Sequence, residues 1–333
     1  LGYEFSGTHQ LTGSCFVAGT AVRMADGTEK PIERVCVGDE VFTHTGQVRK
    51  VVRTFERKYT GDLHTFNVKG WRFPVTMTAD HDCLTVRSKE SVKYRHEFGG
   101  FNKKKAEAVR VGERFLLPNL GDGKRQTLDL LALCDLEETP HGVRDSWRGN
   151  TWESKRHIDI DERLAWLVGL YLADGSLKYN KTIFHLNPDG KKDAADKVIR
   201  LVRELLGDDV EVYTKAPKPT CLQVVVHHAI FAKLMRALVP DTVYNKRLPG
   251  VVLASTKEVR LAALRGWCDG DGHFCKPGKN RGVTVRGVTA SEGLARDMGQ
   301  LALACGLRPS VLRRKRAKHQ RVASMDLYLT GGD

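Results

Sequence analysis

The sequence lacks the features that would place the chain in a membrane, in the secretory pathway or around a zinc ion. No run of about 18 apolar residues occurs, so we expect no membrane-spanning helix. The N-terminus, Leu1 to Phe5, lacks the charged-then-apolar order of a secretory signal. The eight cysteines, at positions 15, 36, 83, 134, 221, 268, 275 and 305, form no Cys-x-x-Cys pair, which argues against a zinc ribbon. A reducing cytosol is the default for such a chain, so we expect a cytoplasmic protein.

Acidic residues are in deficit. The chain has 40 Asp and Glu against 54 Lys and Arg, a net charge of +14 and a pI of about 9.4. That excess predicts a polyanionic partner, with nucleic acid ahead of a membrane surface. With 333 residues, 41% of them hydrophobic, the chain can form two domains, each with its own core.

Two nine-residue segments, Leu167–Gly175 and Leu264–Gly272, are variants of one another. Each has an apolar helical stretch, two small residues four positions apart and an Asp-Gly stop. Small residues at that spacing let two helix backbones approach closely, and the final Gly predicts a left-handed cap. Two such helices side by side would bring Asp174 and Asp271 together. Close carboxylates at a buried seam repel each other unless cations lie between them, so the pair suits Mg²⁺-assisted cutting of a phosphodiester.

Two plainer interpretations explain less. Ordinary helices capped by Asp-Gly account for one segment but not for the double occurrence. A calcium loop beginning at Asp269 needs a bidentate Glu at its twelfth position, where the chain has Asn280.

The paired segments resemble the signature of LAGLIDADG homing endonucleases. Their acids lie 97 positions apart (174 to 271), which leaves room for one αββαββα half. The resemblance implies a double-stranded DNA target, Mg²⁺ as the cofactor with Asp174 and Asp271 as its ligands, and a monomer whose two halves are related by a pseudo-twofold axis.

The N-terminal third reads as short strands separated by Gly-containing turns, which predicts a compact all-β fold. The expected strands are Thr20–Met24, Glu40–Thr43, Lys50–Arg57, Leu63–Val68 and Cys83–Arg87. Within this region, the segments Ser14–Thr20, Pro31–Val41, Thr76–His81 and Lys105–Pro118 resemble, in order, the N-terminal splicing region of an intein, the Hint fold shared with hedgehog autoprocessing domains. Residues 15–118 would form this domain, and residues 1–14 would be a remnant of the host protein, the N-extein.

The residue types fit that chemistry. The Cys15 thiol can attack the carbonyl of the Ser14–Cys15 peptide bond and form a thioester. His81 can supply the proton that the leaving amide nitrogen needs, and Thr78 can polarise the scissile carbonyl. A buried free Cys and a core His are the commoner interpretation for either residue alone, but four motif elements in family order outweigh it.

Residues 119–155 are polar and mixed, and we interpret them as a linker with some helix near Leu128–Leu136. Residues 156–333 then follow an αββαββα pattern twice, with halves at about 156–240 and 241–333. The expected helices are Asp161–Ala173, Asp193–Leu206, Ala229–Leu238, Lys257–Gly270 and Ser291–Cys305. The expected fold is thus a mainly-β Hint domain followed by an α+β LAGLIDADG endonuclease.

The basic residues of the expected strands and loops are candidates for DNA contact, because curved β-ribbons fit a major groove. They are Lys178, Lys181, Lys215, Lys218, Lys276, Lys279, Arg281, Arg286, Arg313, Arg314, Lys315 and Arg316. The block Tyr244–Pro249 resembles the segment that precedes the second signature in intein endonucleases, which implies that Lys246 lies beside the active site. Lys315 and Lys318 both remain candidates for the family's second lysine.

The sequence departs from the intein pattern at its end, Leu327–Asp333, where the family's C-terminal splicing segment with its His-Asn is absent. Residue 1 is not Met either, so we expect a piece of a longer chain, or a partner polypeptide that supplies the rest. Two rival functions stay open. One is a LAGLIDADG module that binds DNA without cutting it, and the other is a hedgehog-like autoprocessing domain, which leaves residues 156–333 unexplained.

Overall fold

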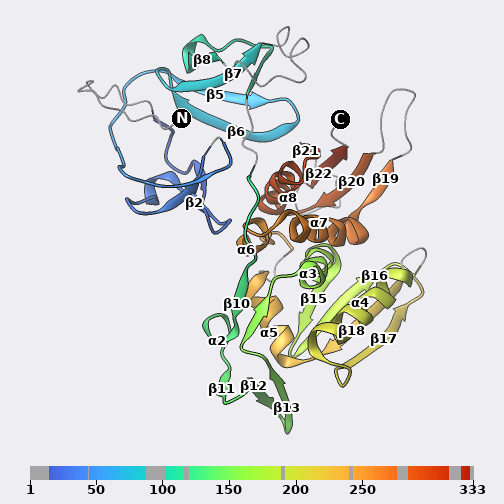
Figure 1. The fold of residues 1–333 in the computed structure, drawn as a ribbon. Coiled ribbons are helices and arrows are strands. Elements are labelled where there is room, and N and C mark those ends of the chain that lie inside the picture. The colour runs from blue at the N-terminus through green and yellow to red at the C-terminus, as the bar shows by residue number, and fades with distance from the viewer. Residues whose placement is uncertain are drawn as a thin grey trace. The chain divides into compact units, whose positions relative to one another are not determined.

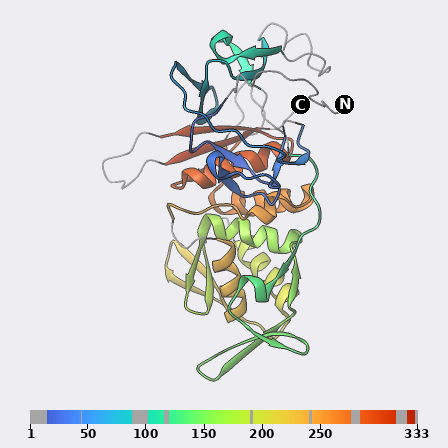
Figure 2. The same cartoon turned by 90° about the vertical axis from the view of Figure 1, so that its left-hand side faces the viewer.

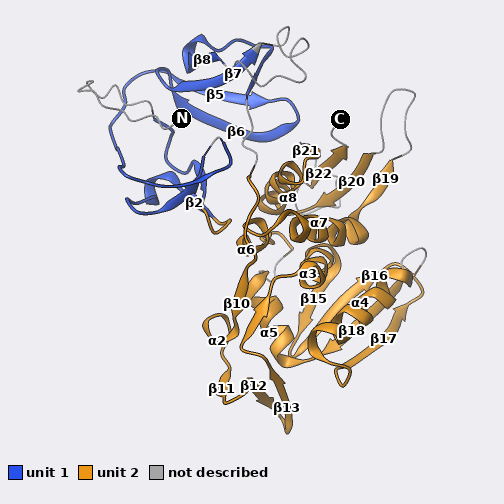
Figure 3. Ribbon diagram, viewed as in Figure 1, with its two compact units in different colours: residues 1–24, 29–118 blue, residues 25–28, 119–333 orange. Residues whose placement is uncertain are grey.

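The computed structural model describes residues 15–43, 45–87, 102–115, 120–188, 192–239, 243–275, 284–314 and 324–330 (Figure 1). The chain divides into two compact units (Figure 3). Unit 1 contains residues 1–24 and 29–118, and unit 2 contains residues 25–28 and 119–333. Within the described ranges, no helix is long and apolar enough to cross a membrane.

Unit 1 is built from short antiparallel strands, as the Gly-containing turns predict. They are β1 (Ala21–Arg23), β2 (Glu29–Pro31), β3 (Glu40–Phe42), β4 (Val48–Lys50), β5 (Leu63–Val68), β6 (Trp71–Thr78), β7 (Asp82–Arg87), β8 (Asn102–Lys105) and β9 (Glu113–Phe115). Strands β1–β2, β3–β4 and β5–β6 pair as hairpins, and β7 lies between β8 and β9. Of the predicted strand Lys50–Arg57 only Lys50, the last residue of β4, lies in a strand, and residues 51–60 form neither helix nor strand.

The core of unit 1 gathers around the end of β6. Met77, Cys83 and Ala106 are buried together. Phe16, Phe66 and Phe115 pack against them, with the rings of Phe66 and Phe115 5.0 Å apart. The segment that begins at Cys15 is thereby fixed to the core, because Phe16 and Met77 form a backbone bridge.

Unit 2 contains the predicted repeat. The first half consists of α3 (Glu162–Asp174), β15 (Gly175–Lys178), β16 (Lys181–Leu186), α4 (Lys192–Leu206), β17 (Glu211–Lys218), β18 (Cys221–His227) and α5 (Ala229–Leu238). The second consists of α7 (Lys257–Asp271), β19 (His273–Cys275), β20 (Thr284–Thr289), α8 (Glu292–Ala304), β21 (Arg308–Arg313) and β22 (Met325–Thr330). The five predicted helices form within two residues of their expected bounds.

Each half forms an antiparallel sheet, in the orders β15-β16-β18-β17 and β19-β20-β22-β21. The alternation of a strand decides which side chains face the helices. In β16, Thr182, Phe184 and Leu186 are buried, and Phe184 packs edge-on against Tyr171 of α3 at 6.3 Å. Lys181 and His185 of the same strand therefore lie on the other face, which is half-exposed. In the second half, buried Gly287 packs beneath Trp267 of α7, so Arg286 and Val288 of β20 lie on the other face.

Helices α3 and α7 lie side by side between the two sheets (Figures 1 and 2). Their close approach depends on Gly169 and Gly266. A Cβ atom on Gly169 would collide with the Ala263 carbonyl oxygen, and one on Gly266 would collide with the Trp166 carbonyl oxygen. The two contacts correspond at an offset of 97 residues (169 to 266 and 166 to 263), which is the pseudo-twofold relation expected from the repeated segments.

The glycines that end these helices differ from our prediction of a left-handed cap. Gly175 and Gly272 have φ of −93° and −77° and extended backbones. Glycine is needed at both positions because a side chain would not fit. A Cβ atom on Gly175 would collide with Tyr171, and one on Gly272 would collide with the Cys268 carbonyl. The chain turns directly from each helix into a strand, and the close return over the last helical turn excludes a side chain.

The linker predicted over residues 119–155 is instead structured from residue 120 and belongs to unit 2. It forms β10 (Thr127–Asp129), α2 (Leu130–Leu133), β11 (Glu137–Thr139), β12 (Gly142–Trp147), β13 (Asn150–Ser154) and, just beyond, β14 (His157–Asp159). Of the predicted helix near Leu128–Leu136, only Leu130–Leu133 is helical. Polar strands such as β13 are stable here because β11, β12 and β13 form a meander that packs against α5.

Candidate functional site: two acids at a helix seam

Asp174 and Asp271 are the last residues of α3 and α7. Gly270, which precedes Asp271, has its vacant Cβ position 3.2 Å from Asp174 Oδ2 and against the Ala173 side chain. The carboxylate of Asp174 therefore reaches across the seam to the end of the partner helix. The small residues Ala173 and Gly270 are what allow the two helix ends to come this close.

Asp269 and Asp271 are two positions apart but have different surroundings. Asp269 Oδ2 accepts a 2.8 Å hydrogen bond from Trp166 Nε1. Asp269 also interacts with Lys197. Burial lowers the pKa of Lys197, and the negative charge of Asp269 acts to raise it. Lys197 in turn lies 4.0 Å from the Trp166 ring centroid. Asp269 is thus held in a structural contact between α7, α3 and α4, and Asp271 is the acid at the seam.

Lys246 lies at the carboxyl end of α3. Its ammonium donates to the carbonyl oxygens of Tyr171 at 3.2 Å, Leu172 at 3.0 Å and Gly175 at 3.5 Å. Tyr171 and Leu172 belong to the last turn of α3, where the carbonyl oxygens carry the negative end of the helix dipole. Burial lowers the pKa of Lys246, which is 7% exposed, while Asp271 and Asp174 act to raise it. Lys246 therefore interacts electrostatically with both acids.

The backbone around Lys246 is fixed by α8. Ser291, the N-cap of α8, donates from Oγ to the Lys246 carbonyl at 2.7 Å. Asp297 of α8 accepts from Arg247 at 2.6 and 2.8 Å and from the Leu248 amide at 3.2 Å. Lys246 lies in an irregular segment but has a defined position, because α8 binds its carbonyl and the two residues that follow it.

His185 is a further polar group near Asp174. Its Nε2 lies 2.7 Å from Ser176 Oγ and its Nδ1 lies 3.1 Å from Gln223 Nε2. Burial lowers the pKa of His185, and Asp174 opposes that shift. The three residues lie on β15, β16 and β18, and form a polar row on the sheet face that adjoins the two acids.

The predicted DNA contacts of the first half lie on this face or at its ends. Lys178 ends β15 and is exposed, as are Lys215 and Lys218 of β17. Lys181 is less available, because its ammonium donates to Tyr213 Oη at 3.1 Å and lies 5.5 Å from the Tyr213 ring centroid.

In the second half, Arg286 and Arg314 both pair with Asp326, which is 4% exposed. Arg286 Nη2 lies 3.2 Å from one Asp326 oxygen and Arg314 Nε lies 2.7 Å from the other. One buried carboxylate thus holds two of the predicted DNA contacts in place, while Arg313 is exposed. The other candidates, Lys276, Lys279, Arg281, Lys315, Arg316 and Lys318, lie outside the described residues.

The donor set at the seam fits Mg²⁺ among biological metals. Mg²⁺ binds oxygen ligands, keeps several waters and commonly uses one or two carboxylates plus substrate phosphates. Asp174 and Asp271 supply carboxylate oxygens, and within the described ranges no group of three or more His, Cys, Asp or Glu side chains is arranged to hold a metal.

Unit 1 contains the second candidate site. Thr78 Oγ1 accepts from the Cys15 amide at 3.0 Å and donates to the Cys15 carbonyl at 3.3 Å, and the Thr78 amide donates to the same carbonyl at 3.0 Å. The Cys15 amide nitrogen is the leaving group of the predicted reaction. Thr78 therefore contacts the leaving nitrogen, whereas Ser14, whose carbonyl we expected it to polarise, lies outside the described residues.

His81 is joined to the same place by a turn, since its amide donates to the Thr78 carbonyl at 3.0 Å. Its ring centroid lies 4.2 Å from that of Phe16. The buried Nδ1 has no hydrogen-bond partner among the described residues. Burial is the main effect on His81 and lowers its pKa, so the ring is favoured in its neutral form.

Arg57 was not among the predicted site residues. It pairs with Asp80 at 3.1 Å and also donates to the Cys15 side chain, the contact that most raises its pKa. Its segment has no strand or helix and no motif, so the sequence offered no signal for it.

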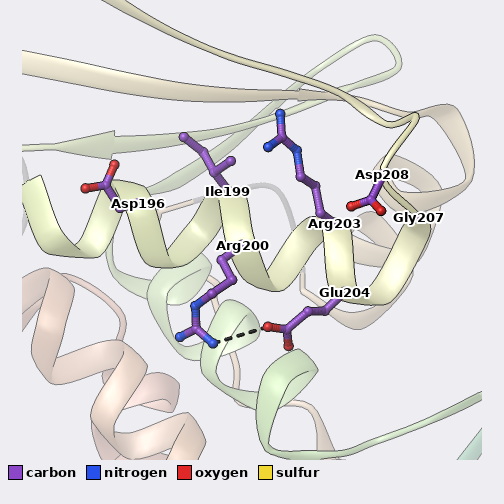
Figure 4. Close-up of a pocket in the computed structure, with 7 residues that line it drawn as sticks. All are labelled: Asp196, Ile199, Arg200, Arg203, Glu204, Gly207 and Asp208. Carbon is purple, nitrogen blue, oxygen red and sulfur yellow. Dashed lines mark hydrogen bonds and ion pairs between the residues drawn. The ribbon is translucent and has the colours of Figure 1, made fainter.

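A pocket on the surface of unit 2 lies elsewhere. It follows α4 and the turn after it, and is lined by Asp196, Ile199, Arg200, Arg203, Glu204, Gly207 and Asp208 (Figure 4). Arg200 and Glu204 form an ion pair of 3.2 Å there. None of its residues belongs to either candidate site.

Comparison with protein families gives two matches. The family model described as Hom_end-associated Hint matches residues 15–114. The model described as LAGLIDADG-like domain matches residues 258–332. One part of the chain thus matches a Hint model and another a LAGLIDADG model, as an intein with an embedded endonuclease would.

Individual relatives are distant and much longer. ATP-dependent DNA helicase Hel308 of Thermococcus kodakarensis is 24% identical over 90% of this chain, and DNA polymerase II large subunit of the same organism is 25% identical over 60%. This chain spans 28% of the helicase and 13% of the polymerase subunit. Among solved structures, I-DmoI in complex with DNA and Mn is 14% identical, with a TM-score of 0.38 over 51% of this chain and 90% of its own.

Proposed function

We propose that the LAGLIDADG domain cuts both strands of a DNA target with Mg²⁺ held by Asp174 and Asp271. Support comes from the meeting of the two acids at the ends of α3 and α7, where Asp174 Oδ2 reaches the Gly270 position of the other helix. The biological outcome would be cleavage of an intein-less allele, which allows the element to be copied in.

The residues of the chain have distinct parts in this proposal. Asp174 and Asp271 hold the cation, which when bound supplies charge stabilisation to the scissile phosphates. Lys246 offsets the charge of the two acids and of the incoming phosphate. The polar faces of the two sheets hold the duplex, with exposed Lys178, Lys215, Lys218 and Arg313 against its phosphates.

The test is a plasmid-cleavage selection on a randomised target library, followed by assay of variants on the recovered substrate. Asp174→Asn and Asp271→Asn should each lose Mg²⁺-dependent cleavage and keep DNA binding. Asp269→Asn is the matched control: it keeps an acceptor for Trp166, so its cleavage should stay within a few-fold of the parent. Unchanged cutting by Asp271→Asn, or equal loss in Asp269→Asn, would contradict the assignment.

We propose further that the Hint domain performs an N-to-S acyl shift at Cys15. The Cys15 thiol gives up its proton as its sulfur attacks the Ser14 carbonyl carbon, a C–S bond forms, the C–N bond breaks, and the amide nitrogen gains a proton. His81, whose ring is favoured in its neutral form, can accept the thiol proton and then deliver it to that nitrogen, which donates to the Thr78 hydroxyl. Arg57 contacts the Cys15 side chain and lies beside the reacting sulfur.

Thiol treatment of the full chain should release residues 1–14, and mass spectrometry measures that release. Cys15→Ala should abolish it, because no thioester can form, while Cys36→Ala, at an exposed cysteine of the same domain, should not. Release that persists in Cys15→Ala would remove Cys15 as the nucleophile.

A binding module without nuclease activity remains the alternative. Both acids and Lys246 are in place at the seam, which favours cleavage. Failure of the wild-type chain to nick any sequence that it binds, with Mg²⁺ present, would favour the binding module.

A further inference from the structure

Two β-turns meet at the end of the first half's sheet that is remote from Asp174. The turn between β12 and β13 carries Trp147 and Arg148, and the turn between β15 and β16 carries Tyr179. The rings of Trp147 and Tyr179 are stacked, with centroids 6.3 Å apart and planes 19° apart. The Arg148 guanidinium lies 4.5 Å from the Trp147 ring centroid. We call these three residues the tip cluster.

The tip cluster is exposed, which is unusual for large aromatic side chains. Trp147 is 41% exposed and Tyr179 is 73% exposed. The backbone is also unusual: Arg148 and Tyr179 have φ of 50° and 55°, and they are the non-glycine residues with positive φ in the part of the chain that the structure describes. Left-handed backbone at bulky residues persists where the surroundings impose it, and it is found often at functional positions.

The meander that carries Trp147 is fixed to the first half. Trp152 of β13 lies with its ring centroid 5.6 Å from that of His227, the last residue of β18. Asp145 of β12 pairs with Lys233 of α5 at 3.0 Å. The turn is therefore held next to the β15–β16 turn by contacts to a strand and a helix.

Positive charge lies at the stacked rings. Arg148 lies over the Trp147 ring, and exposed Lys178 directly precedes Tyr179 in the sequence. Flat aromatic faces combined with cations suit a nucleic acid, whose sugars and phosphates offer apolar surface and negative charge together. The same two strands carry the sheet face that adjoins Asp174.

We propose that the tip cluster is an accessory contact for the sugar–phosphate backbone of the DNA duplex, on one flank of the cleavage site. The proposal rests on the proposed nuclease function. From Asp174 to Tyr179 the extended chain spans about 16 Å at ~3.3 Å per residue. A duplex rises ~3.4 Å per base pair, so the contact falls about five base pairs from the cut.

The experiment measures binding of the full chain to a fluorescein-labelled 40-base-pair random-sequence duplex by anisotropy, over a series of salt concentrations without divalent ions. The variant is Trp147→Ala with Arg148→Asn, because Asn tolerates the left-handed conformation that position 148 requires. We expect about tenfold weaker binding and a log–log salt slope smaller by about one, as loss of one phosphate contact predicts. Arg200→Ala, on α4, is the matched control and should bind as the wild type does.

A second measurement locates the contact on a substrate recovered by cleavage selection. Trimming one flank to about four base pairs from the cut should weaken wild-type binding to the level of the variant and erase the difference between them. Equal affinities of wild type and variant on both probes would overturn the proposal. A thermal melt checks that the variant is folded. The proposal is also overturned if that variant is unfolded while a second one, Trp147→Phe with Arg148→Asn, is folded and binds DNA as the wild type does.

Failure of the proposed function gives a different result. A wild-type chain that binds DNA and shows the tip effect but never nicks any substrate contradicts the nuclease alone. A wild type that cuts, with variants that bind and cut equally well, contradicts the tip cluster alone. Loss of self-association in the variant without loss of DNA affinity assigns the surface to a second copy of this chain and also overturns the proposal.

Discussion

At the residue scale, neighbouring residues of the same type have different tasks because their surroundings differ. Asp269 bonds to the buried Trp166 indole, while Asp271 lies at the seam with Asp174. Lys246 differs from the exposed lysines in the same way, since three carbonyl oxygens at the end of α3 accept from its ammonium. Position relative to the two helix ends, rather than residue type, decides which groups belong to the site.

Lys246 gives a prediction at this scale. Lys246→Met should lower the free energy of unfolding by about 2–4 kcal/mol, because buried carbonyls lose a charged donor. Urea unfolding checks this, with Lys257→Met at the start of α7 as the control.

The pH dependence has a definite sign. Because burial lowers the pKa of Lys246 in the folded state, the unfolded chain binds its proton more tightly. Stability should therefore rise with pH from that lowered pKa up to about 10.5, the ordinary value, relative to Lys246→Met. If the difference in the free energy of unfolding between the two proteins falls over this window, burial does not lower the pKa of Lys246.

At the element scale, the helix pair α3–α7 depends on two glycines that meet backbone rather than side chain. Gly169 faces the Ala263 carbonyl and Gly266 faces the Trp166 carbonyl. Backbone atoms of a helix cannot move aside as a flexible side chain does. The approach of the helix axes, and with it the meeting of the two acids, is thus set by the absence of two Cβ atoms.

Gly169→Ala and Gly266→Ala should each destabilise unit 2 by about 3 kcal/mol, the upper range for overpacking, and by similar amounts because the two contacts are equivalent. Chemical unfolding followed by tryptophan fluorescence measures the loss. Ala173→Gly, in the same helix, serves as control and should cost about 1 kcal/mol. If either alanine variant is as stable as the wild type, the axes of α3 and α7 can move apart without loss of stability.

The helices were predictable from sequence because their apolar residues recur with helical period, and the five expected helices form close to their predicted bounds. The prediction of left-handed caps at Gly175 and Gly272 was wrong, since both glycines have negative φ and are needed because no side chain fits there. The strands of residues 120–159 were also missed. Their composition is polar, and they are stabilised by pairing with each other and by packing on α5, neither of which leaves a local pattern.

At the scale of the whole molecule, the surplus of basic residues determines how the chain should meet DNA. The net charge is +14, and exposed Lys178, Lys215, Lys218 and Arg313 lie on the strands of unit 2. Two other basic residues, Arg286 and Arg314, are engaged by Asp326. The electrostatic contribution to DNA binding therefore comes from fewer side chains than the number of Lys and Arg residues indicates.

DNA affinity should fall steeply with salt, by about 10³-fold between 50 and 200 mM if about six phosphates are contacted. Lys215→Ala with Lys218→Ala should reduce the log–log slope by about two, while Arg200→Ala should leave it unchanged. Anisotropy on a labelled duplex gives both slopes. A flat response to salt would contradict DNA binding through the basic sheet faces.

The sequence by itself predicted the two domains, the repeated helices with their acids, and Cys15, Thr78 and His81 as candidates for a splicing site. Those features are local, since each is carried by spacing within a short segment. Only the tertiary structure decided that Asp269 is bound by Trp166, that Lys246 donates to the carbonyls at the end of α3, and that Arg57 lies beside Cys15. It also brought Trp147 against Tyr179. Each of these depends on contacts between segments distant in the sequence, which packing of whole elements produces and no local pattern records.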